Sequence, residues 1–126
     1  MRSKVHIVLV IAVAIFITPS LYAANEVPRD MWLDGMSKLL PEAFCQPEQF
    51  FRQCFEVSEE TCQQTATSTT RDCIEKLKGE MPEMFDTENG QYWGTQVGAC
   101  AGSSYSMALL KNFKDTKKCN DPEAWK

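Results

Sequence analysis

Six cysteines and one histidine are the residues of this 126-residue chain with the clearest capacity for chemistry. The histidine, His6, lies in an apolar segment near the N-terminus. No Cys-x-x-Cys pair occurs, which argues against thiol–disulfide exchange and against a zinc knuckle. An even number of cysteines in a short exported chain is typical of structural disulfides. We therefore expect all six to be paired: Cys45, Cys54, Cys62, Cys73, Cys100 and Cys119.

Residues 1–23 have the composition of a secretory signal peptide. Arg2 and Lys4 precede an unbroken apolar run, and a small residue, Ala23, stands where cleavage would fall. Cleavage there would leave residues 24–126 as a single exported, all-helical, disulfide-rich domain, whose length supports one modest core. No cysteine follows the cleavage position at once, so lipoprotein processing is not indicated.

The alternative is an uncleaved membrane anchor, because the apolar stretch 5–24 reaches the length of about 20 residues that a bilayer requires. Pro19, with polar Thr18 and Ser20 beside it, argues against an anchor. We expect contact with a membrane only if the segment is kept. In either case the remainder is exported, and the segment resembles bacterial signals in length and build. The sequence thus predicts a periplasmic or secreted protein of a bacterial host.

The position of His6 excludes most catalytic arrangements from the exported part. Without histidine, the Ser-His-Asp and Cys-His arrangements and histidine metal sites cannot be built. The segment 102–106 lacks the closing glycine of a nucleophile elbow, and the segment 98–103 lacks the lysine of a phosphate loop. The exported part carries 11 basic against 17 acidic residues, which argues against nucleic acid as a partner. We expect no enzyme activity and no cofactor.

Two constellations remain as alternatives. Carboxylate pairs can hydrolyse glycosides without histidine, and the candidates are Glu59, Glu60, Glu80 and Glu83. Glu59 and Glu60 are, however, explained by a place at the start of a helix.

The other alternative is the Met-x-x-Met pair formed by Met81 and Met84. Its soft sulfurs suit Cu(I) and would make the protein a copper carrier. Packing of both methionines against the core is the interpretation that we favour. No metal site is therefore predicted.

The composition of the exported part predicts an all-α fold. It holds one isoleucine and three valines, whereas strands favour β-branched residues. The predicted fold is a small disulfide-stapled helical bundle with a central antiparallel helical hairpin. About four helices are predicted: 28–40, closed by Pro41; 47–56, begun by Pro47; 59–79, capped by Ser58; and 91–114, after a linker at 80–91 that contains Pro82 and Asn89-Gly90.

The second and third helices would form the hairpin, and helical spacing then suggests which cysteines pair. Cys62 and Cys73 lie eleven residues apart, within about 20° of the same helix face. Paired positions of an antiparallel hairpin have nearly equal sums of residue numbers, which predicts Cys54–Cys62, Cys45–Cys73 and, by remainder, Cys100–Cys119. A doubly stapled hairpin resembles the layout of twin C-x9-C helical proteins, with spacings here of C-x8-C and C-x10-C. The resemblance implies no function.

The fourth helix carries a ridge of small residues four apart: Gly94, Gly98, Gly102 and Ser106. Each glycine costs about 1 kcal/mol relative to alanine in a helix interior, so the ridge requires a reason. Close packing against the hairpin is the simplest one. A groove that receives a partner's helix or peptide is the functional alternative, and part of the segment could instead be loop.

The sequence favours a non-enzymatic binding or structural accessory protein of the cell envelope or extracellular space. Its expected partner is another exported or envelope protein, and inhibition of an exported enzyme is an alternative form of that role, because a stapled domain is preorganised. The polar stretch 63–70 would supply an exposed face.

Overall fold

The computed structural model describes residues 25–126. The predicted signal segment, residues 1–23, lies outside the described residues. Four α-helices dominate, which confirms the all-α class, and the only strands of the described part are a two-residue antiparallel pair. The elements are β1 (Val27–Pro28), α1 (Arg29–Phe44), α2 (Phe50–Gln53), α3 (Glu59–Leu77), η2 (Lys78–Glu80), β2 (Met84–Phe85), α4 (Thr87–Ala108), η3 (Leu110–Asn112) and η4 (Pro122–Trp125).

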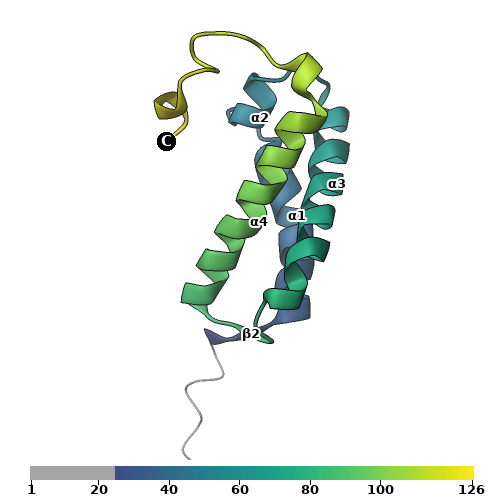
Figure 1. The fold of residues 1–126 in the computed structure, drawn as a ribbon, viewed down its shortest axis with the longest axis vertical. Coiled ribbons are helices and arrows are strands. Elements are labelled where there is room, and N and C mark those ends of the chain that lie inside the picture. Colours follow the sequence, from purple (N-terminus) through teal and green to yellow (C-terminus); the bar gives the residue numbers. More distant parts are fainter. Residues whose placement is uncertain (1–24) are drawn as a thin grey trace, which may run out of the picture.

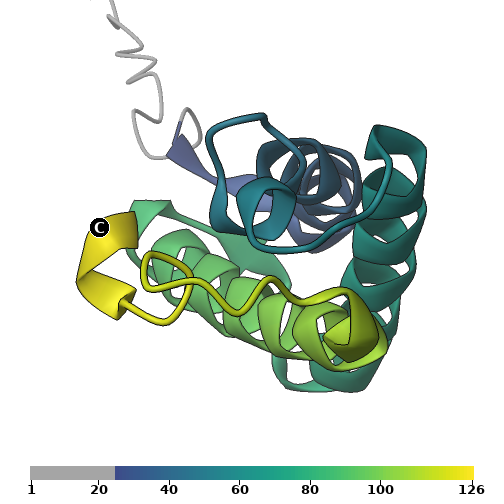
Figure 2. The same cartoon turned by 90° about the horizontal axis from the view of Figure 1, so that it is seen from above.

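The long helices lie along one another, and α3 packs against both α1 and α4 (Figures 1 and 2). The short helix α2 lies at one end of this bundle, and β2 lies at the opposite end (Figure 1). Two apolar clusters form the core. The larger one lies around Tyr105 and Phe55 near α2, and the smaller one lies around Val97 and Phe85 near the β pair.

The starts of α3 and α4 are fixed by side-chain caps. The amide N–H of Thr61 donates to Ser58 Oγ at 3.1 Å, so the predicted cap is confirmed. At α4, the N–H of Asn89 donates to Asp86 Oδ1 at 2.8 Å, and the N–H of Asp86 donates to Asn89 Oδ1 at 2.9 Å. This reciprocal box begins α4 at Thr87. The prediction that Asn89-Gly90 belongs to a linker was therefore wrong, because Asn89 caps the helix.

Three other predicted helix spans were wrong. Pro41 does not close the first helix: it is buried inside the last turn of α1, which continues to Phe44. Proline is tolerated there because its ring packs in the core while only one helical hydrogen bond is lost. The predicted second helix shrinks to the single turn of α2, Phe50–Gln53, because the chain before and after it runs as turns and extended backbone. The predicted fourth helix also ends early, because α4 stops at Ala108 rather than continuing to residue 114.

The three disulfides join Cys45 to Cys62, Cys54 to Cys119 and Cys73 to Cys100. All six cysteines are paired as expected, but each of the three predicted pairs, Cys54–Cys62, Cys45–Cys73 and Cys100–Cys119, is wrong. The argument from equal sums required two long helices on either side of residue 57. Because α2 is one turn long, α3 instead packs against the two other long helices, α1 and α4. The first disulfide links α3 to the end of α1, and the third links it to α4.

The C-terminal segment folds back over α2. The N–H of Lys114 donates to the carbonyl of Cys54 at 2.8 Å, beside a bridge between Phe55 and Phe113. Further along, the indole N–H of Trp125 donates to the Lys118 carbonyl at 3.0 Å. The Cys54–Cys119 disulfide holds this segment covalently, so the yellow tail in Figure 1 is a fixed part of the fold.

Candidate functional site

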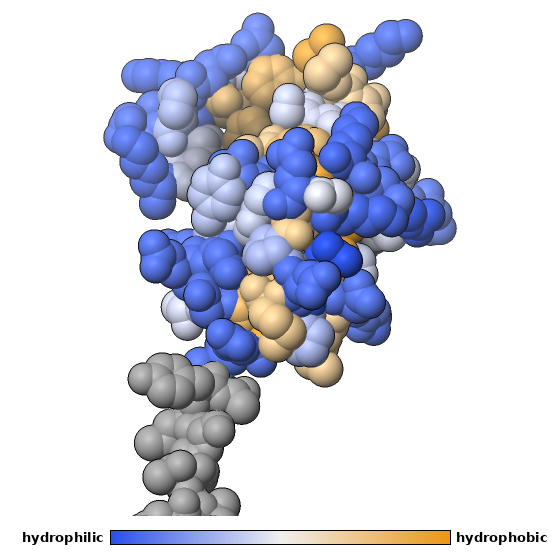
Figure 3. Space-filling view, turned by 60° about the horizontal axis from the view of Figure 1, so that its bottom comes forward, coloured by the Kyte–Doolittle hydropathy of each residue, from blue (hydrophilic) through white to orange (hydrophobic). Residues whose placement is uncertain are grey.

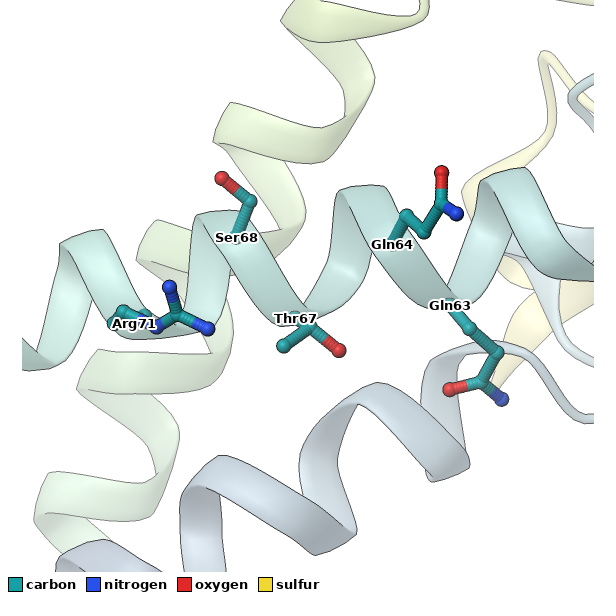
Figure 4. Close-up of a pocket in the computed structure, with 5 residues that line it drawn as sticks. All are labelled: Gln63, Gln64, Thr67, Ser68 and Arg71. Carbon is teal, nitrogen blue, oxygen red and sulfur yellow. The ribbon is translucent and has the colours of Figure 1, made fainter.

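A hollow of about 420 Å³ lies on the outer face of α3 (Figure 4). Its lining consists of polar side chains from this one helix, at positions that recur about every turn: Gln63, Gln64, Thr67, Ser68 and Arg71. Gln63 and Thr67 point to one side of the helix, and Gln64 and Ser68 point to the other. Arg71 lies along the helix with its guanidinium directed toward Thr67. The hollow therefore has amide, hydroxyl and guanidinium groups, with no carboxylate and no aromatic ring.

Most of these groups make no hydrogen bond to any of residues 25–126. Only the Gln64 amide is engaged, since its N–H donates to Glu60 Oε1 at 3.1 Å. Arg71 forms no ion pair in this part of the chain. Glu75, one turn further along α3, pairs with Lys78 at 2.7 Å. The hollow thus presents hydrogen-bonding capacity that the fold does not use.

The small-residue ridge of α4 is covered in part by aromatic side chains. A Cβ at Gly94 would lie 3.8 Å from Trp32 Cζ2, and one at Gly102 would lie 2.9 Å from Phe51 Cζ. A Cβ at Gly98 would meet no atom of the described residues within 4 Å. Ser106 donates from its hydroxyl to the Gly102 carbonyl at 2.9 Å. The ridge therefore admits the rings of Trp32 and Phe51 rather than forming a continuous open groove.

The two methionines of the Met-x-x-Met pair lie in different environments. Met81 is 5% exposed and packs with Ile74, Phe85 and Val97. Met84 is 43% exposed. This placement explains Met81 by core packing and provides no accessible pair of sulfurs for Cu(I).

The candidate carboxylates do not meet in a cleft. Glu59 and Glu60 lie in the first turn of α3, whereas Glu80 and Glu83 follow its far end. A helix of 19 residues is about 28 Å long, whereas the catalytic pairs of glycosidases lie about 5–9.5 Å apart. All four side chains are exposed. Within residues 25–126, no group of three or more cysteine, aspartate or glutamate side chains is arranged to hold a metal ion.

A second hollow, of about 340 Å³, lies at the start of α4. Its lining residues are Asp86, Glu88, Asn89 and Tyr92. Asp86 and Asn89 already bind each other's backbone in the capping box, and the Asn89 amide also donates to the Met84 carbonyl at 3.3 Å. Asp86 and Asn89 of this hollow thus stabilise the start of α4, whereas Gln64 is the only lining residue of the α3 hollow with a side-chain hydrogen bond to the described residues.

The remaining surface is largely hydrophilic. On the face drawn in Figure 3, apolar areas are separated by hydrophilic side chains. No helix among the described residues combines the length and apolar character needed to cross a bilayer. The exposed large apolar side chains come from several elements: Val27, Met31, Leu39, Met84, Tyr92, Met107 and Leu110.

Fold and surface together define a small helical protein whose rigidity comes from disulfides. Residues 26–113, more than two thirds of the chain, match the family described as T2SS substrate NttA. The protein belongs to this family of type II secretion substrates, and it is an exported protein, secreted or periplasmic, of a bacterial host. No curated protein and no solved structure shows significant similarity to the chain.

Sequence reasoning identified the polar stretch 63–70 as an exposed face but missed Arg71. The signal was present, because positions 63, 64, 67, 68 and 71 follow the helical period of about 3.6 residues. The stretch 63–70 is continuous in sequence and ends before Arg71, whereas the helix face that contains its exposed residues extends to Arg71. Thr69 and Thr70, which belong to the same stretch, are buried.

Proposed function

We propose that the exported protein is a non-enzymatic binding protein that recognises its ligand through the hollow on α3. The observation that carries this proposal is the set of unused polar groups in a hollow of about 420 Å³, a volume within the usual range for ligand sites. The scaffold supports it, since disulfides tie α3 to both neighbouring helices. A preorganised site loses little conformational entropy when it binds.

Chemistry argues in the same direction. The described residues contain no histidine, their cysteines are all disulfide-bonded, and their candidate carboxylates are dispersed. The expected ligand is carried by another exported or envelope component. Inhibition of an exported enzyme would be one form of such binding.

Site-specific photo-crosslinking tests the proposal. A photoreactive residue placed at Ser68, inside the hollow, is expected to give a specific adduct when the full protein is produced and exported by its host. The matched control is Ala124, an exposed position in the C-terminal segment. Adducts at Ser68 alone would support the proposal. Identical adducts at both positions, or none at Ser68, would contradict it.

A further inference from the structure

The hydroxyl groups of the α3 hollow lack a bond that several other helical hydroxyls of this protein make. Thr69, Thr95 and Ser106 each donate to the carbonyl four residues earlier, at 2.9 Å. Thr67 and Ser68 make no such bond to any described residue. Their hydroxyls are therefore free both to donate and to accept, without first breaking a bond to their own helix.

Arg71 adds a charge that the helix does not neutralise. Glu75 is positioned one turn away but binds Lys78 instead, and Figure 4 shows the Arg71 guanidinium directed toward Thr67. A guanidinium has five donors in a planar fork that matches the two oxygens of a carboxylate. The hollow thus favours a ligand that carries an anionic group of this shape.

The other lining groups restrict the rest of the ligand. Gln64 donates its amide to Glu60, which leaves its carbonyl oxygen as an acceptor. Gln63 has a complete amide, with donors and an acceptor. An acceptor needs a donor from the ligand. An acidic peptide offers only its backbone N–H groups for this, because its side-chain carboxylates have no donor at neutral pH. Sugar hydroxyls both donate and accept. The lining also lacks the apolar side chains that a lipid would require.

From these groups we infer that the hollow binds an acidic carbohydrate, with Arg71 on the carboxylate of a uronic or sialic acid unit. The hydroxyls of Thr67 and Ser68 and the amide of Gln63 then bind hydroxyls of the sugar. This inference rests on the proposed function and specifies the ligand class for the same site.

Titration calorimetry of the mature, oxidised protein tests the inference. The probes are a tetrasaccharide that contains glucuronic acid, a neutral glucose tetrasaccharide and a tetraglutamate peptide. We expect the acidic sugar to bind at least about tenfold more tightly than either of the others, because it alone provides both the carboxylate and the hydroxyls. Arg71→Gln is expected to weaken its binding about tenfold or more, and Thr67→Val with Ser68→Ala is expected to weaken it as well.

The control is Lys111→Gln, which removes the same charge at an exposed position in η3. It is expected to leave the affinity unchanged within twofold. Equal loss in both charge variants would show non-specific attraction and overturn the inference, as would tighter binding of the peptide or no binding of the acidic sugar. If sugars fail while Ser68 still crosslinks to a specific protein, the ligand class is wrong and the proposed function stands. If both experiments fail, the site itself is wrong.

Discussion

Gly102 of α4 lies directly against the ring of Phe51: a Cβ at this position would come within 2.9 Å of Phe51 Cζ. Phe51 in turn stacks on Phe44, with ring centroids 4.1 Å apart. The phenol of Tyr105 donates to the Phe51 carbonyl at 3.1 Å. One glycine therefore determines how α2 and the end of α1 seat against α4.

Gly102→Ala should destabilise the protein, whereas Gly98→Ala should stabilise it. At Gly102 the added methyl group must displace a ring packed on both sides, which costs about 1–3 kcal/mol. At Gly98 no atom of residues 25–126 lies within 4 Å of the new Cβ, so the variant should gain the helix propensity of alanine, about 1 kcal/mol. Urea denaturation of both variants measures the difference. Equal shifts of the two midpoints would contradict the packing described for Gly102.

Thr70→Val should raise the free energy of unfolding by about 1 kcal/mol. The Thr70 hydroxyl is buried without a hydrogen-bond partner among residues 25–126, and replacing it with a methyl group of similar shape removes a desolvation cost. Thr69→Val is the matched control, because the Thr69 hydroxyl donates to the carbonyls of Thr65 and Ala66. Thermal unfolding should show a gain for the first variant and none for the second. A gain of equal size in both would show that the added methyl group, rather than the removal of an unpaired hydroxyl, is responsible.

Tyr105 should make stability depend on pH in the alkaline range. Burial raises the pKa of its phenol above the ordinary value of 10.0, and the nearby Arg52 charge lowers it to a smaller extent. Because the folded-state pKa is the higher one, the contribution of the neutral phenol is complete below pH 10.0 and is lost as the pH rises through the folded-state value.

Tyr105→Phe should cost about 1 kcal/mol at neutral pH, because the Phe51 carbonyl loses its donor. The difference between wild type and variant should shrink above pH 10.0. Brief urea unfolding at a series of pH values measures it. A difference that stays constant through the alkaline range would contradict the raised pKa.

Removal of the Cys54–Cys119 disulfide should release the C-terminal segment. Its sequence separation of 65 residues is the longest of the three, and chain-entropy estimates assign about 4 kcal/mol to a loop of that size. In Cys54→Ala/Cys119→Ala, trypsin should cut after Lys114, Lys117 and Lys118 much faster than in wild type. Cys73→Ala/Cys100→Ala is the control, because it leaves intact the Cys54–Cys119 disulfide that holds the C-terminal segment. Non-reducing peptide mapping that joined Cys100 to Cys119 would refute the connectivity outright.

The sequence was sufficient where local chemistry decides the structure. The Ser58 cap, the start of α3 at Glu59 and the all-α class depend on neighbouring residues and on composition, and all three are confirmed. Pro41 shows the limit of such signals, since tertiary packing of its ring keeps it inside α1. Asn89 shows another, because the same side chain that favours a turn also completes a capping box.

The disulfide pairs could not be predicted because they depend on contacts between distant segments. Cys54 meets Cys119 only because the tail returns beside α2 through the Phe55–Phe113 bridge. Helical spacing contains no information about that return. The α3 hollow could be predicted only in part. The helical period places Arg71 on the face of Gln64 and Thr67, but only the structure shows that Glu75 pairs with Lys78 and not with Arg71.

The connectivity also sets an order of events during export. When the chain is exported N-terminus first, Cys45 and Cys54 are the first cysteines to leave the cytoplasm. They do not pair with each other, because Cys45 binds Cys62 and Cys54 binds Cys119. Cys54 must stay reduced, or be freed by thiol–disulfide exchange, until Cys119 has also emerged. The Cys54–Cys119 bond therefore reports that the chain as far as residue 119 has crossed the membrane, and a product that ended before this residue would carry an unpaired Cys54.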